Sequence, residues 1–165
     1  MDFGRFFRHI FTGRAAVSAA FPAATLDAIE RAVQQAEATH TGQIRVVIEA
    51  SLDGPRLWAD ETARERAAEV FSLMRVWDTE YNNGVLIYLL MADRDVEIVA
   101  DRGIHAKCGA DAWEAVCREM ERHFREGQFE EGALAGVRAV GSHLARHYPG
   151  SGARGNELPD RPVVL

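Results

Sequence analysis

Residues 82–101 read NNGVLIYLLMADRDVEIVAD, and this stretch decides the fold. Its first half, residues 84–91, is almost wholly apolar, which is typical of a strand in the middle of a sheet that is covered on both sides. A short polar turn follows at residues 92–95, and apolar residues then recur at every second position from 96 to 100. The two halves therefore predict an antiparallel hairpin.

Upstream of this hairpin, residues 43–50 alternate between apolar and polar side chains and predict another strand. A helix predicted over residues 56–74 joins the two strands, and such a β-α-β crossover places them parallel. Further helices are expected after Thr25, which is a suitable N-cap, and over residues 111–124 and 129–147. We therefore expect an α/β fold, namely a three-layer, Rossmann-like α/β/α sandwich with a small mixed sheet.

The size and composition bound the class of protein. A chain of 165 residues can bury one core, so we divide it into an N-terminal arm (1–22), one domain (23–149) and a flexible C-terminal tail (150–165). The net charge of −6 argues against a nucleic-acid partner, which needs a basic face. The longest apolar run, residues 85–92, is too short for a transmembrane helix. Two cysteines suit a reducing compartment, so we expect a cytoplasmic protein.

The N-terminal arm predicts an amphipathic helix. Its apolar stripe contains Phe3, Phe6, Phe7, Ile10 and Phe11, and the basic residues Arg5, Arg8, His9 and Arg14 lie off that stripe. Such a helix either lies on a membrane surface through residues 3–11, or docks on the core of its own domain. Because positive charge persists to Arg14 and the apolar stretch after it is short, we expect no cleaved signal peptide.

The C-terminal tail ends in the apolar residues 163–165. A fully solvated tail gives no reason for three apolar residues at its end. The β-branched valines among them favour an extended conformation. Pro159 and Pro162 lack backbone donors, so this segment can pair with a sheet only as an edge strand. A free end and an extended, docked end therefore remain as alternatives.

Polar residues gather at one predicted edge of the sheet. Asn82 and Asn83 precede the central strand, Asp101 follows its antiparallel neighbour, and Asp78 in the preceding linker is close enough in sequence to reach them. Carboxylate and amide oxygens are ligands that Ca²⁺ and Mg²⁺ accept, so we predict a divalent-cation site at Asp78, Asn82, Asn83 and Asp101. The alternative is structural: the asparagines make a turn and Asp101 caps a loop.

Other combinations of reactive residues do not fit a catalytic pattern. The zinc-like set His105, Cys108, Cys117 and His123 has the spacing of no zinc finger or ribbon. Asp93 and Asp95 resemble an aspartyl-phosphate motif, but Glu97 stands where such a motif needs threonine or valine. Neither cysteine is followed by arginine at the spacing of a thiolate phosphatase. We expect no nucleotide or organic cofactor.

The pattern from residue 41 to 147 resembles the TPM-domain family, named after thylakoid-lumen and photosystem-repair proteins. The resemblance lies in residues 42–49, 63–71, 82–87, 92–98, 101–104 and 124–132. It implies the Rossmann-like sandwich that the periodicity indicates independently. Some plant members are described as acid phosphatases and calcium binders. The chain is similar to the short, untethered bacterial members, which implies a partner such as a membrane-anchored TPM protein or a LemA-like protein.

Two functional hypotheses follow. The first is a non-enzymatic accessory or interaction domain that binds a divalent cation and works with a membrane-associated partner. The alternative is a divalent-metal-dependent, acid phosphatase-like phosphohydrolase centred on Asp78, Asn83 and Asp101, in which phosphoryl transfer would depend on positioning and charge neutralisation. The absence of a recognisable nucleophile in the sequence favours the first hypothesis.

Overall fold

A computed structural model of the chain describes residues 2–151 and 155–165. The described elements are α1 (Phe3–Phe11), α2 (Arg14–Ala20), α3 (Ala23–Glu37), β1 (Gln43–Glu49), α4 (Gly54–Trp58), α5 (Ala63–Leu73), β2 (Gly84–Leu90), β3 (Asp95–Ala100), α6 (Arg102–Cys108), α7 (Ala110–Arg125), α8 (Phe129–His147) and β4 (Val163–Val164).

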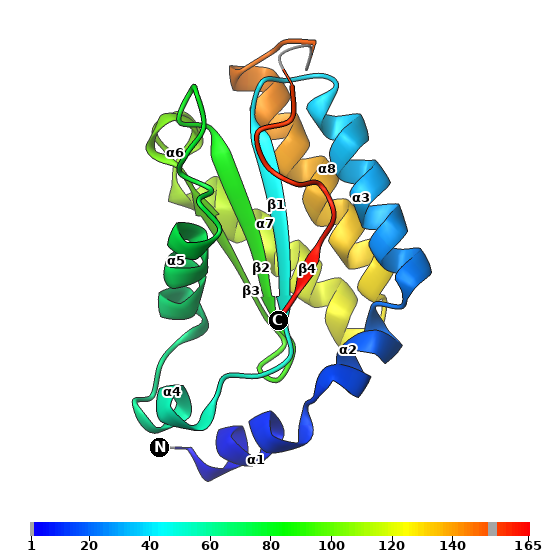
Figure 1. Ribbon diagram of the computed structural model, residues 1–165, viewed down its shortest axis with the longest axis vertical. Coiled ribbons are helices and arrows are strands. Elements are labelled where there is room, and N and C mark those ends of the chain that lie inside the picture. Colours follow the sequence, from blue (N-terminus) through cyan, green and yellow to red (C-terminus); the bar gives the residue numbers. More distant parts are fainter. Residues whose placement is uncertain (1, 152–154) are drawn as a thin grey trace.

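The four described strands form one mixed sheet in the order β3-β2-β1-β4. β1 and β2 are parallel, with Gln43 opposite Gly84, and β3 returns antiparallel to β2, with Val85 opposite Ala100. Helices α3, α7 and α8 lie over one face of the sheet and α5 lies over the other (Figure 1). The expected α/β/α sandwich with its crossover and hairpin is therefore confirmed.

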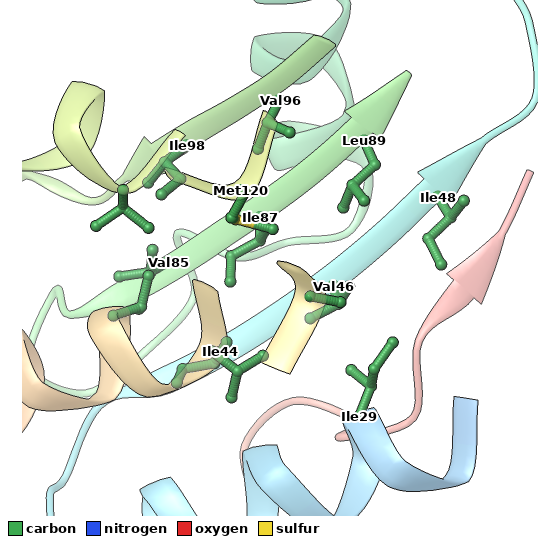
Figure 2. Close-up of a cluster of buried hydrophobic side chains, with 14 of the residues drawn as sticks. Ile29, Ile44, Val46, Ile48, Val85, Ile87, Leu89, Val96, Ile98 and Met120 are labelled. Carbon is green, nitrogen blue, oxygen red and sulfur yellow. The ribbon is translucent and has the colours of Figure 1, made fainter. Parts of the chain in front are cut away.

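The strands bury both of their faces, which explains their continuous apolar character. One face contributes alternate residues of β1, β2 and β3 to a core shared with α3, α7 and α8, and Figure 2 shows Ile44, Ile87 and Met120 in this core. The opposite face contributes Leu86 and Tyr88 to a second core with α5. Each core thus follows from the two-residue period of the strands.

The second core also contains a buried ion pair. Arg66 of α5 donates from Nε and Nη2 to the two carboxylate oxygens of Glu49, each at 2.9 Å. The Tyr88 hydroxyl donates to Glu49 at 2.6 Å. Because each Glu49 oxygen accepts at least one hydrogen bond, this charged residue can stand in a covered strand at low cost.

Some helices differ from those expected. The predicted helix over residues 56–74 is divided into α4 and α5, because Asp60 adopts a positive φ of 59° between them. Thr62 then begins α5 with a capping box, in which Thr62 and Glu65 each satisfy a backbone N–H of the other. Thr25 lies inside α3, whose N-cap is Pro22. The short helix α6 was not expected at all.

The C-terminal segment is part of the sheet rather than the flexible tail that we expected. Val163 and Val164 form β4 and pair parallel with Val47 and Ile48 of β1, which is the extended, docked alternative. Residues 152–154 of the expected tail lie outside the described residues. The sequence already contained the physical reason, since β-branched residues favour an extended edge strand.

Helix α1 docks through its polar side, which differs from the alternative in which its apolar stripe covers the core. Arg5 and His9 face the domain, and only Phe6 of the stripe packs against a buried cluster. Phe3, Phe7, Ile10 and Phe11 are exposed. In the part of the chain that the structure describes, no helix has the length and apolarity to cross a membrane.

Candidate functional site

Two of the four predicted residues, Asn83 and Asp101, lie at one edge of the sheet. Asn83 directly precedes β2, and Asp101 directly follows β3. The backbone N–H of Asp101 donates to the carbonyl of Gly84 at 2.9 Å. The parallel start of β1 lies alongside, because the Gln43 N–H donates to the Asn83 carbonyl at 3.4 Å. The antiparallel hairpin and the parallel crossover therefore bring these residues to one edge of the sheet.

Asn83 is fully buried at this edge. Its backbone N–H donates to the Thr79 hydroxyl at 3.2 Å, and its Nδ2 donates to the Thr41 hydroxyl at 3.3 Å. Its amide oxygen Oδ1 is buried and accepts no hydrogen bond from any described residue. A buried acceptor without a donor costs free energy, so this oxygen is suited to a ligand that donates a hydrogen bond or carries positive charge.

Asp101 shows the same combination of one satisfied and one unsatisfied oxygen. It is the N-cap of α6, where Oδ1 accepts from the Arg102 N–H at 2.7 Å. Its Oδ2 is buried and receives no hydrogen bond from the described part of the chain. Nearby, burial and the Asp101 carboxylate raise the pKa of Tyr148, which keeps that phenol protonated at neutral pH.

The other two predicted residues lie apart from this pair. Asp78 is half-exposed and accepts a 2.6 Å hydrogen bond from Arg75, three residues earlier. Asn82 is exposed and has a positive φ of 52°, a turn conformation that asparagine tolerates well. The sequence therefore placed the edge correctly, but it could not resolve which linker side chains turn towards it.

Two glycines allow the backbone to approach closely around this edge. A Cβ on Gly84 would lie 2.0 Å from the Val76 carbonyl oxygen. A Cβ on Gly103 would lie 2.5 Å from the Asn82 carbonyl oxygen and 2.7 Å from the Tyr148 hydroxyl. Contacts this short with backbone atoms exclude any side chain, so both glycines hold the linker and α6 against the sheet.

Thr79 and Tyr148 belong to this edge and were missed in the sequence. Neither lies in a motif, and Tyr148 comes from beyond α8, so only the folded chain brings it here. His40 is buried, and burial lowers its pKa to about 4. His40 is therefore a neutral imidazole at physiological pH, and it cannot act as an imidazolium acid in catalysis.

The donor set fits a divalent cation only in part. Asn83 Oδ1 and Asp101 Oδ2 are oxygen ligands of the correct type, whereas six or more are usual for Ca²⁺. Among residues 2–151 and 155–165, no three histidine, cysteine, aspartate or glutamate residues are grouped for metal binding. A cation at this edge would therefore depend on the amide oxygen, one carboxylate and water.

Cys117, one of the four residues of the zinc-like set, has a protonated thiol at neutral pH. Burial, followed by the nearby Glu97 and Glu121 carboxylates, raises the pKa of Cys117 to about 12. It therefore lacks the thiolate character of a reactive cysteine.

Two solved protein structures are similar in fold to this chain. The NMR structure of the BA42 protein from the psychrophilic bacterium Bizionia argentinensis is 28% identical, with a TM-score of 0.76 over 88% of this chain and 95% of that one. The solution structure of the N-terminal domain of a P. gingivalis protein is 21% identical, with a TM-score of 0.62 over 76% of this chain and 79% of that one. The second similarity concerns the fold alone.

No curated protein matches this chain. The family model of the TPM domain matches residues 17–143, which span every described element from β1 to α7 and most of α8. The match contains the candidate edge, with Asn83 and Asp101, and it excludes both α1 and β4. The chain therefore belongs to the TPM domain family.

Proposed function

We propose that this chain is a non-enzymatic accessory domain that works at a membrane surface, where α1 makes the contact and a membrane-associated protein is its partner. The observation that carries the proposal is the outer face of α1. Phe3, Phe7, Ile10 and Phe11 are each more than half exposed, at 71%, 55%, 56% and 80%. Single exposed apolar residues are ordinary, but four on one face of a nine-residue helix form a contact surface.

The orientation of this face is fixed by the opposite side of the helix. Arg5 donates to the Asp93 carboxylate at 3.0 Å and to the Glu61 carbonyl at 2.7 Å. The buried His9 accepts the Leu52 N–H at Nδ1, at 2.9 Å, and its Nε2 lies 3.0 Å from Asp93. Because polar anchors hold the inner side, the apolar side is presented to the outside.

The chemistry of the exposed face suits a lipid surface containing anionic headgroups. Phenylalanine rings bury well at the boundary between headgroups and acyl chains, and Phe7 stacks on Phe11 with ring centroids 6.4 Å apart. Arg8 is half-exposed although it lies 3.6 Å from Asp93, and Arg14 is exposed at the start of α2. Their charges complement an anionic surface, which a general apolar protein contact would not require.

Vesicle co-sedimentation tests this proposal. The full chain should bind vesicles that contain phosphatidylserine more strongly than vesicles of phosphatidylcholine alone. Phe7→Ser with Phe11→Ser should weaken binding by about tenfold or more, because two exposed rings no longer enter the lipid. The thermal midpoint of this variant should stay unchanged.

Leu73→Ser is the matched control, since Leu73 is 64% exposed on α5. It should leave vesicle binding unchanged. If the parent chain does not sediment with either vesicle type, or if both variants behave alike, the membrane proposal is wrong. A protein contact would then be the better explanation of the face.

A second proposal concerns the candidate edge, and the two unsatisfied oxygens of Asn83 and Asp101 favour it. We infer that this edge binds a divalent cation weakly, with Ca²⁺ or Mg²⁺ as the occupant. The metal-dependent phosphohydrolase alternative requires the same cation, so one set of variants addresses both.

A thermal titration tests the cation. At about one hundred times the dissociation constant, binding to the folded state alone adds about 2.7 kcal/mol to the free energy of unfolding. Asp101→Ser should abolish this gain while it retains an N-cap for α6. Asp78→Ala should keep the gain, because Asp78 pairs with Arg75 instead. Equal gains in all three proteins would exclude the site, and metal-dependent hydrolysis of phosphomonoesters lost only with Asp101→Ser would establish an enzyme.

A further inference from the structure

The segment of residues 156–165, called the strap below, is held on β1 largely through its main chain. The Gln43 side-chain oxygen accepts the N–H groups of Glu157 and Leu158 at 3.1 and 2.9 Å. Arg45 donates from Nη1 to the carbonyls of Pro159 and Arg161 at 2.6 and 2.8 Å. These two β1 side chains would recognise the backbone of any extended peptide in this place.

The strap then continues as an added strand. Val163 and Val164 pair with β1, and the Leu165 N–H donates to the Ile48 carbonyl at 2.9 Å. The Ala50 N–H donates back to the Leu165 carbonyl oxygen at 3.3 Å. Without the strap, β1 would be an open edge, which is a template for the addition of another strand.

Three kinds of side-chain contact give this groove its selectivity. Leu158 is buried in the second core, and Val163 and Leu165 pack against the same cluster. Arg161 donates to Asp27 at 2.7 Å and to Glu30 at 2.8 Å, both on α3. We therefore expect the groove to prefer a peptide with an apolar residue in the place of Leu158 and a cationic residue in the place of Arg161. Apolar residues are expected in the places of Val163 and Leu165.

Arg45 is a cation that the backbone of the strap satisfies. With the strap in place its side chain is buried, and burial lowers the pKa of the guanidinium. The two strap carbonyls accept hydrogen bonds from this covered charge, which would otherwise be costly to bury. Another extended peptide could supply the same two carbonyls.

The strap forms the shortest described strand of the sheet. Its strand is two residues long, and its ion pairs to α3 lie near the surface, because Arg161 and Asp27 are about half exposed. Edge elements of this kind open at a lower free energy than the central strands.

We propose that the β1 edge is a peptide-binding groove for an extended segment of a partner protein, and that the strap occupies it in cis. The partner segment has the pattern of the strap: an apolar residue in the Leu158 place, a cationic one in the Arg161 place, and apolar ones in the Val163 and Leu165 places. Binding displaces the strap and adds the partner as a strand parallel to β1. This surface is separate from the exposed face of α1.

The test uses a fluorescent peptide with the sequence of residues 156–165 and full-length chains. In the receptor, Leu158→Asp with Arg161→Glu weakens the strap, because a carboxylate then meets the second core and another meets Asp27 and Glu30. The peptide should bind this receptor about tenfold or more tightly than it binds the parent, whose groove is occupied in cis. Adding Arg45→Met to the receptor should abolish binding while circular dichroism shows a folded chain.

Peptide variants provide controls that leave the receptor unchanged. An Arg161→Glu peptide should not bind, and an Arg161→Lys peptide should keep most of the affinity. Should the double variant not fold, Arg161→Glu alone, at an exposed position, serves as the receptor. The proposal is overturned if no saturable binding occurs to the folded receptor, or if the Arg161→Glu peptide binds as well as the parent peptide.

Discussion

At the scale of single residues, buried polar groups fall into two kinds: those that are fully hydrogen-bonded within the fold, and those that lack a partner and mark the candidate site. Glu49, Arg66 and Tyr88 are hydrogen-bonded to one another inside the second core, and Arg66 also donates to Glu69 of the same helix. Asn83 and Asp101 each keep one buried oxygen without a donor among the described residues. A satisfied group stabilises the fold, whereas an unsatisfied one costs free energy that a ligand can recover.

Glu37 carries a partly buried carboxyl whose effect on stability depends on pH. Its Oε1 accepts the Ile44 N–H at 2.8 Å. Burial, together with the nearby Asp160 and Glu157 carboxylates, raises the pKa of Glu37 from 4.5 to about 8. Between these two values the folded chain holds a proton that the unfolded chain has lost. The free energy of unfolding therefore falls as the pH rises through this window.

Glu37→Gln should remove this contribution to the pH dependence, because the amide keeps the acceptor for Ile44 and carries no charge. We expect the variant to match the parent near pH 4 and to be more stable by about 2 kcal/mol near pH 8. Urea unfolding of both proteins at several pH values measures this difference. A constant difference across the whole range would contradict the assignment.

At the scale of elements, the sequence predicted those parts that follow from periodicity. The two-residue alternation of β1 and the apolar run of β2 each have one physical cause, which is burial on one or both faces of a sheet. The hairpin and the crossover then placed Asn83 and Asp101 at one edge. This much of the candidate site was therefore predictable.

The rest depended on contacts between distant segments. The break between α4 and α5 requires a positive φ at Asp60, which is not a residue that signals such a break by itself. The docked side of α1 depends on Asp93, 88 residues after Arg5, and no local pattern contains that pair. Apolar periodicity gave the stripe of α1 correctly, but it could not show that polar anchors on the other side would decide the orientation.

Helix α6 provides a test of close packing at the element scale. Gly103→Ala would place a methyl group 2.5 Å from the Asn82 carbonyl oxygen, and a backbone atom cannot move away cheaply. We expect a loss of about 2 to 3 kcal/mol in the free energy of unfolding. Gly54→Ala in α4 is the control, since its methyl group would meet open space, and it should have little effect or stabilise slightly. Chemical denaturation measures both variants, and equal effects would show that α6 is not fixed by this contact.

At the scale of the whole molecule, the two ends of the parallel strands have different roles. In open α/β sheets, ligands usually bind outside the carboxyl ends of the strands. Helix α1 lies at that end (Figure 1). It is held there because Leu52, after β1, and Asp93, after β2, both contact His9. The unsatisfied oxygens of Asn83 and Asp101 lie at the opposite end, before β2 and after β3. With α1 at the carboxyl ends of the strands, this opposite edge is the candidate site.

Asp93 anchors α1 at the carboxyl ends of the strands through its contacts with Arg5 and His9. Burial raises the pKa of the Asp93 carboxyl, but bonds from Arg5 and His9 outweigh burial and hold the pKa below its usual value. The carboxylate therefore stabilises the fold above the ordinary aspartate pKa, and this stabilisation is lost as the pH falls through the lowered value. Asp93→Ala removes the shared partner of Arg5 and His9, so α1 should detach while the sheet, which has its own cores, remains folded.

We expect Asp93→Ala to lower the free energy of unfolding by about 2 to 4 kcal/mol, because His9 and Arg5 lose the largely covered carboxylate that they share. Limited proteolysis should become faster within α1 and α2, and hydrogen exchange in β1 and β2 should stay slow. Asp60→Asn is the control: Asp60 lies 3.9 Å from Arg5 and is 69% exposed, and asparagine tolerates the positive φ of this position, so loss of the charge alone should change stability by less than about 0.5 kcal/mol. If Asp93→Ala exposed β1 and β2 to exchange as readily as α1, the helix would be part of the cooperative core, and a contact surface on it could not move independently of the sheet.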